Sequence, residues 1–106
     1  GNGSTDGTFI YTGFKPAFIM VKSAVGGTGN WQINDSARDT FNLCNKPVYA
    51  NLNEAEGVDT SWDAVSNGFK MRQGFGSKNG SGRTYIYMAF AEAPIVGSNN
   101  VPANAR

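Results

Sequence analysis

The sequence of 106 residues contains no histidine and only one cysteine, Cys44. Histidine is the commonest general base and a common ligand of transition metals, so its absence excludes the usual catalytic triads and most zinc sites. A lone cysteine forms no internal disulfide, and without a histidine it has no evident partner that would activate it as a nucleophile. We therefore predict that the chain is not an enzyme and that it uses no cofactor.

Charged residues are also scarce, at 16% of the chain, and the net charge is +1. Binding to nucleic acid requires clustered lysine and arginine side chains that neutralise several phosphates, whereas the nine basic residues here are scattered. The longest apolar stretches, around residues 17–21 and 85–91, are far shorter than the roughly 20 residues that a membrane-spanning helix needs. These features predict no nucleic-acid partner and no insertion into a membrane.

Glycine, by contrast, is abundant, and most of the 14 glycines fall within residues 1–13, 26–29 and 74–82. Glycine adopts the positive φ angles of tight turns, so these clusters indicate turns between strands. Short runs rich in β-branched and aromatic residues lie between the clusters, at the spacing expected for a sandwich or a barrel. The strands that we predict cover residues 8–12, 17–22, 30–35, 47–52, 69–72 and 83–92.

The alternation of apolar and polar residues predicts which side chains of these strands point inward. Trp31 and Ile33 share one face of their strand, and we expect that face to lie in the core. Phe69 and Met71 are expected to point inward for the same reason. The run 83–92 is apolar on both faces, which predicts a central strand buried between two layers.

These patterns together predict an all-β fold, namely a compact antiparallel β-sandwich of jelly-roll-like form with Gly/Asn-rich turns. Pro94 follows the last predicted strand, and the composition after it is typical of a linker. We therefore place the β-sandwich module in residues 1–94 and a C-terminal linker or tail in residues 95–106. The opening Gly-Asn-Gly-Ser is also linker-like, which indicates a module of a longer polypeptide.

Trp62 is a candidate for an exposed aromatic residue because it follows the polar residues 59–61. Exposed aromatic rings stack on sugars or fill the pockets of protein partners. An aromatic side chain that plugs the end of a sandwich is equally compatible with this position. With Tyr49, Asn51 and Asp63, Trp62 forms a candidate binding site for a glycan or a receptor.

The acidic residues provide one candidate metal site and one hypothetical catalytic pair. Glu56, Asp59 and Asp63 could supply oxygen ligands to calcium, but their spacing differs from the twelve-residue EF-hand loop. A solvated acidic loop explains them as well, so we predict no metal site. Asp35 and Glu92 end two predicted strands and could approach each other, although nothing in their spacing specifies a hydrolytic pair.

Several short motifs occur in a fixed order along nearly the whole chain. GNGSTDGTFIYTGFKPAF at residues 1–18 is followed by GNW at 29–31, DSARD at 35–39 and SNGFKMR at 66–72. NGSGRTYIYMAFAE at 79–92 and NAR at 104–106 complete the series. In this order the chain resembles an uncharacterised β-rich domain that recurs in tail-fibre and other structural proteins of marine tailed bacteriophages, cyanophages among them.

The resemblance implies a location on the virion surface, a structural or adhesive role, and no catalytic residues. The implied partners are other virion proteins or copies of the chain itself in a homo-oligomer. Our first hypothesis is a module of a tail fibre or another appendage, which presents loops 39–63 and 73–82 for assembly or host-surface contact. The alternative is a lectin-like module that binds host glycans through Trp62 and Tyr49.

Overall fold

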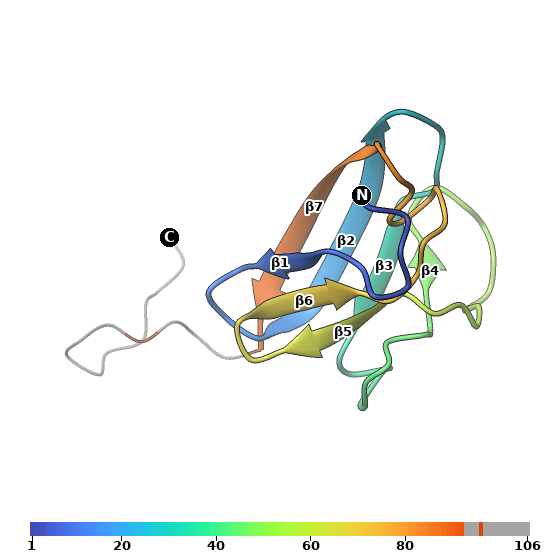
Figure 1. Ribbon diagram of the computed structural model, residues 1–106. Helices are drawn as coiled ribbons and strands as arrows, with labels where there is room; N and C mark the ends of the chain where they lie inside the picture. Colours follow the sequence, from blue (N-terminus) through green and yellow to red (C-terminus); the bar gives the residue numbers. More distant parts are fainter. Residues whose placement is uncertain (93–95, 97–106) are drawn as a thin grey trace.

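The computed structural model describes residues 1–92 and Val96, which fold into two antiparallel β-sheets without a helix (Figure 1). The predicted all-β sandwich is confirmed. Residues 95–106, predicted to be a linker, lie outside the described residues apart from Val96. The described residues contain no helix that could span a membrane. The strands are β1 (Phe9–Tyr11), β2 (Pro16–Val25), β3 (Gln32–Asp35), β4 (Val48–Tyr49), β5 (Trp62–Val65), β6 (Gly68–Met71) and β7 (Thr84–Ala91).

The smaller sheet has three strands in the order β1-β6-β5, and the larger sheet has four in the order β4-β3-β2-β7. Figure 1 shows the smaller sheet lying across one face of the larger sheet. Strands β2 and β7 form the longest ladder, in which Phe18 lies opposite Phe90 and Met20 lies opposite Met88. The hairpin of β5 and β6 closes through the predicted turn at residues 66–67.

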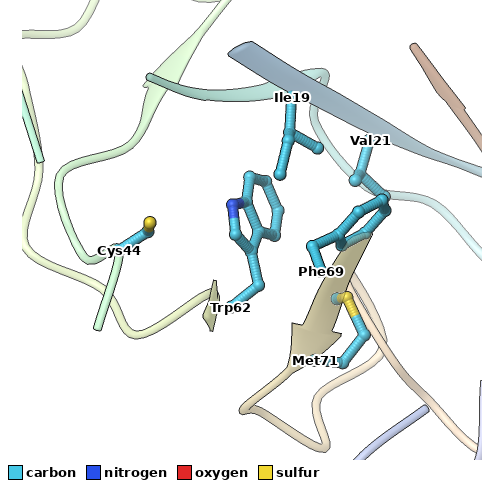
Figure 2. Close-up of a cluster of buried hydrophobic side chains, with 6 residues drawn as sticks. All are labelled: Ile19, Val21, Cys44, Trp62, Phe69 and Met71. Carbon is cyan, nitrogen blue, oxygen red and sulfur yellow. The ribbon is translucent and has the colours of Figure 1, made fainter. Parts of the chain in front are cut away.

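The core fills the space between the two sheets (Figure 2). Phe69 contacts Trp62 edge-on at 6.0 Å between ring centroids and contacts Tyr87 at 5.3 Å, so it ties the smaller sheet to β7. Phe69 and Met71 point inward, as predicted. The buried apolar side chains of this cluster are Ile19, Val21, Cys44, Trp62, Phe69 and Met71.

Strand β3 turns the opposite face inward from the one that we predicted. Gln32 and Asn34 are buried, whereas Trp31 lies just before the strand and is 38% exposed. The prediction of a core position for Trp31 is therefore wrong. The inward amides are hydrogen-bonded to Ser61 and Asp39, which removes most of the penalty for burying them.

Strand β7 occupies an edge of the larger sheet and not the centre that we predicted. Its neighbour is β2, and no other strand of the described residues pairs with its second edge. Tyr85 and Ala89 pack against the core, so the alternate side chains point away from the smaller sheet. We call this apolar surface of the larger sheet the outer face; it comprises Phe18, Met20, Trp31, Ile33, Ile86, Met88 and Phe90.

The N-terminal segment is fastened to the sandwich, although its composition resembles a linker. The Gly3 amide donates to the Asn79 carbonyl at 2.7 Å, and the Gly7 amide donates to the Met71 carbonyl at 3.1 Å. The Asn79 side chain, which is buried, donates to Asn2 Oδ1 at 2.7 Å and to the Ser4 carbonyl at 2.9 Å. A buried asparagine thus fixes a segment whose own residues carry no strand signal.

Candidate functional site

A pocket of about 330 Å³ opens between the two sheets, at the end where β2 begins and β3 ends. Its walls come from these two strand ends, from the loop after β3, from β5 and from Glu92, which follows β7. We call this hollow the end pocket. Its lining includes Lys15, Asn34, Asp39, Phe41, Trp62 and Glu92.

Two buried polar side chains, Asn34 and Asp39, line the end pocket. The Asn34 amide donates to Asp39 Oδ2 at 3.0 Å, and the same oxygen accepts a hydrogen bond from the Lys46 backbone amide at 3.0 Å. Buried polar groups with such partners hold a structure together, because breaking one bond leaves its partner unsatisfied. The pair therefore fixes the loop after β3 against the strand that precedes it.

A chain of buried hydrogen bonds continues from Asn34 to Lys78. Gln32 Nε2 donates both to Asn34 Oδ1, at 3.1 Å, and to Ser61 Oγ. Lys78 Nζ donates to Ser61 Oγ at 3.3 Å and to Asp59 Oδ2 at 2.6 Å. Burial lowers the pKa of Lys78, although the hydrogen bond and the charge of Asp59 oppose this shift. The sequence gives no signal for this lysine, because it lies in a glycine-rich turn without periodicity.

The rim of the end pocket carries two ion pairs. Lys15 Nζ lies 2.7 Å from Glu92 Oε2, and Arg38 Nε lies 2.6 Å from Asp35 Oδ2. The acids Asp35 and Glu92 thus line the same pocket, but each pairs with its own cation. Burial opposes ionisation of Asp35, yet hydrogen bonds from the Arg38 amide and guanidinium lower its pKa below 3.8. A general acid needs a pKa raised toward neutrality, so the shift of Asp35 runs the wrong way for that role.

Phe41 is the exposed aromatic residue of the rim, with 84% of its surface accessible. Sequence reasoning missed it because it lies in the irregular middle of the chain, where no alternation identifies faces. Its neighbours on the lining include the hydroxyl of Thr40 and the amide of Asn42. The rim therefore combines an apolar ring with polar groups.

Trp62 belongs to strand β5 and is 1% exposed. The prediction that it is an exposed loop residue is wrong, and the alternative of an aromatic that closes the sandwich describes it better. Figure 2 shows its indole between Cys44 and Ile19, inside the core cluster. Its neighbour Ser61 is buried too, and hydrogen bonds from Gln32 and Lys78 to its hydroxyl compensate for the loss of water. The polar residues before Trp62 therefore did not indicate an exposed position.

The other three candidate ligand residues do not join Trp62 in the end pocket. Tyr49 is in β4, and Asn51 follows it, with its Oδ1 accepting the Trp31 amide at 2.8 Å. Asp63 pairs with Arg72 at 3.3 Å. None of these three is part of the lining of the end pocket. The structure thus does not bring the four residues into one site.

The candidate calcium ligands are separated as well. Glu56 pairs with Arg38 at 3.0 Å, and Asp59 pairs with Lys78. Asp63 points to a third cation, as described above. Within residues 1–92 and Val96, no three acidic, cysteine or histidine side chains gather in a way that could hold a metal ion. The acidic patch of the sequence is therefore a set of separate ion pairs.

Cys44 is buried in the core cluster and also borders the end pocket. Burial raises the pKa of its thiol to about 11, and nearby carboxylates add to the shift. The thiolate is the nucleophilic form, so this group is protonated and unreactive near neutral pH. A buried, protonated thiol of this kind serves as a small apolar side chain of the core.

Comparison with known proteins places the chain in a family. A search of curated proteins found no match, and a search of solved structures found none either. Residues 1–94 match the model of a family described as a domain of unknown function, DUF7483. The matched range covers all seven strands of both sheets. The chain therefore belongs to the DUF7483 family.

Proposed function

We propose that this chain is a non-enzymatic structural and adhesion module of a tailed-phage virion, in a tail fibre or another surface appendage. The resemblance of nearly the whole chain to such modules supports this proposal. The structural observation that supports it most is the apolar outer face of the larger sheet. Monomeric proteins rarely expose large contiguous apolar patches, and such patches often mark sites of contact with other proteins.

A module of this kind must present its contact surfaces in a fixed shape. The loop after β3 meets this requirement through Asn42, whose side chain donates to the Ala64 carbonyl at 2.7 Å and accepts the Ala64 amide at 2.9 Å. Arg38 holds the same region by donating to the Lys46 carbonyl at 3.0 Å. The region from 39 to 63 also contains β4, which lies within the predicted strand 47–52, and the first two residues of β5.

Labelling of particles tests the proposed function directly. Antibodies raised against the chain should decorate one surface structure of the tailed phage that encodes it, when purified particles are viewed by immunogold electron microscopy. Peptides of the chain should also be found in the same particles by mass spectrometry. Particles that lack both signals, in lysates where the chain is present, would contradict a virion role.

A second candidate function, glycan binding, is favoured by Phe41 at the rim of the end pocket. Sugar rings stack on exposed aromatic side chains, while nearby hydroxyl, amide and carboxylate groups bond to the sugar hydroxyls. Trp62 offers no accessible ring face for this purpose. A lectin-like site in this chain would therefore use Phe41 in place of the residues that the sequence suggested.

Replacing Phe41 with alanine tests this second candidate. If the chain binds a glycan at the end pocket, the substitution should remove most of the signal on an array of host-surface glycans, because stacking is lost. Val58→Ala, which removes an equally exposed apolar side chain outside the pocket, should leave the signal unchanged. Absence of any glycan signal from the unmodified chain would exclude the lectin-like function.

A further inference from the structure

Strand β7, whose second edge is unpaired within residues 1–92, is the most exposed apolar feature of the larger sheet. Tyr87 points toward the smaller sheet yet is 48% exposed, and the outward Ile86, Met88 and Phe90 are 54%, 47% and 57% exposed. Edge strands of natural proteins are usually protected by charged residues, proline or a cover, because their free amides and carbonyls pair readily with another strand. Thr84–Ala91 contains no charged residue and no proline.

The distribution of this exposure distinguishes between two ways of covering the strand. A partner packed flat on the outer face would cover Phe18 and Met20 of β2 as fully as β7, and it would leave Tyr87 uncovered. Phe18 and Met20 are already only partly accessible, whereas β7 is exposed on both of its faces. A strand added beside β7 would cover both faces of β7 at once.

The sequence of β7 is complementary to itself when two copies run antiparallel. Arg83 precedes the strand and Glu92 follows it, with no charge between them. Antiparallel pairing of two copies brings Arg83 of each near Glu92 of the other, which already pairs with its own Lys15, whereas parallel pairing brings the two Arg83 cations together. The edge itself therefore favours a second copy in one orientation.

One register also matches side-chain sizes. When Met88 lies opposite Met88 of the second copy, each tyrosine faces an alanine: Tyr85 faces Ala91, and Tyr87 faces Ala89. On the other side of the sheet, Ile86 faces Phe90 of the second copy. Directly opposite residues of antiparallel strands share a face of the sheet, so this register places the inward faces of the two copies on one side and their outward faces on the other.

We propose that two copies of this chain pair through β7, antiparallel and centred on Met88, so that their larger sheets join into one continuous sheet. Such an interface is isologous, and it closes after two copies. The inference deepens the proposed function, on which it rests, by naming the partner of this surface. It is tested in solution, so its failure leaves the labelling of particles unaffected.

Cross-linking at the centre of the proposed register is the direct test. Opposite residues of an antiparallel ladder have Cβ atoms close enough for a disulfide, so the full chain with Met88→Cys should form a covalent dimer on mild oxidation with diamide. The native Cys44 is buried and should not react. Val58→Cys, with a more exposed site far from β7 in sequence, should form no covalent dimer. A Met88→Cys chain that cross-links no more than the control would overturn the register.

Light scattering after size-exclusion chromatography gives the second measurement. The unmodified full chain should show a dimer whose mass halves in Met88→Lys, because two lysines then lie directly opposite each other. Met88 is outward and half exposed, so the variant should retain the far-ultraviolet circular dichroism of the parent chain. A chain that is monomeric at every concentration overturns the proposal, since another segment or protein then covers β7. A dimer that persists in Met88→Lys overturns it as well, because assembly then uses another surface.

Discussion

Replacing Trp62 with alanine is expected to lower the free energy of unfolding by about 4 kcal/mol, because large-to-small substitutions in a packed core lose apolar contacts and leave a cavity. Trp62 is almost fully buried and touches Phe69, which in turn contacts Tyr87 of the other sheet. A loss of this size is a large fraction of the stability of a small domain. Urea unfolding followed by far-ultraviolet circular dichroism measures it.

Trp31→Ala is the matched control, since it removes the same side chain from a site that is 38% exposed. We expect it to cost about 1 kcal/mol, as is usual for positions outside the core. If Trp31→Ala destabilised the chain as much as Trp62→Ala, the assignment of the core would be incorrect. The comparison also shows why Trp62→Ala is unsuitable as a probe of glycan binding, because the variant would lose binding by unfolding.

Replacing Lys78 with methionine is expected to cost about 2 kcal/mol, because removing the buried ammonium leaves its buried hydrogen-bond partners unsatisfied. The side chain of Lys78 is 1% exposed, and its ammonium donates to Asp59, to Ser61 and to the Thr60 carbonyl at 2.9 Å. Lys15→Met removes a lysine from the exposed pair with Glu92 and should cost less than about 1 kcal/mol. Equal losses in the two variants, measured by urea unfolding, would argue against a structural role of the buried network.

The pH dependence of this pair has a defined sign. The folded chain lowers the pKa of Lys78 from 10.5, so the folded state releases this proton at a lower pH than the unfolded state does. Between the lowered pKa and 10.5, the unfolded state binds more protons, and stability from this group rises with pH. Lys78→Met should lack that rise. A wild-type chain and a variant with parallel pH profiles in this range would contradict the burial of the ammonium.

The sequence predicted the fold class well but the orientation of β3 and the position of β7 poorly. Phe69 and Met71 alternate with charged residues, so their inward direction followed from polarity alone. Polarity failed for Gln32 and Asn34, because their burial depends on partners that are distant in the sequence. The pattern of polar and apolar residues within one strand cannot predict where such partners lie.

The position of β7 and the location of Trp62 were missed for related reasons. A strand that is apolar on both faces predicts that both faces are covered, but it does not say whether the same chain supplies the cover. Trp62 follows polar residues, and one of them, Ser61, is itself buried by its bonds to Gln32 and Lys78. The predicted binding site around Trp62 was wrong for the same reason, since its other residues were chosen on the assumption that the indole is exposed.

Amide hydrogen exchange of the full chain, resolved by residue with nuclear magnetic resonance at low and high protein concentration, tests the central claim most directly. That claim is that the packed core between the two sheets supports β7, whose edge pairs with a second copy of the chain. We predict that the amides of β2 and β6 exchange slowly at both concentrations. Alternate amides of β7 should exchange fast at low concentration and slowly at high concentration. Exchange in β7 that is the same at both concentrations would contradict the account.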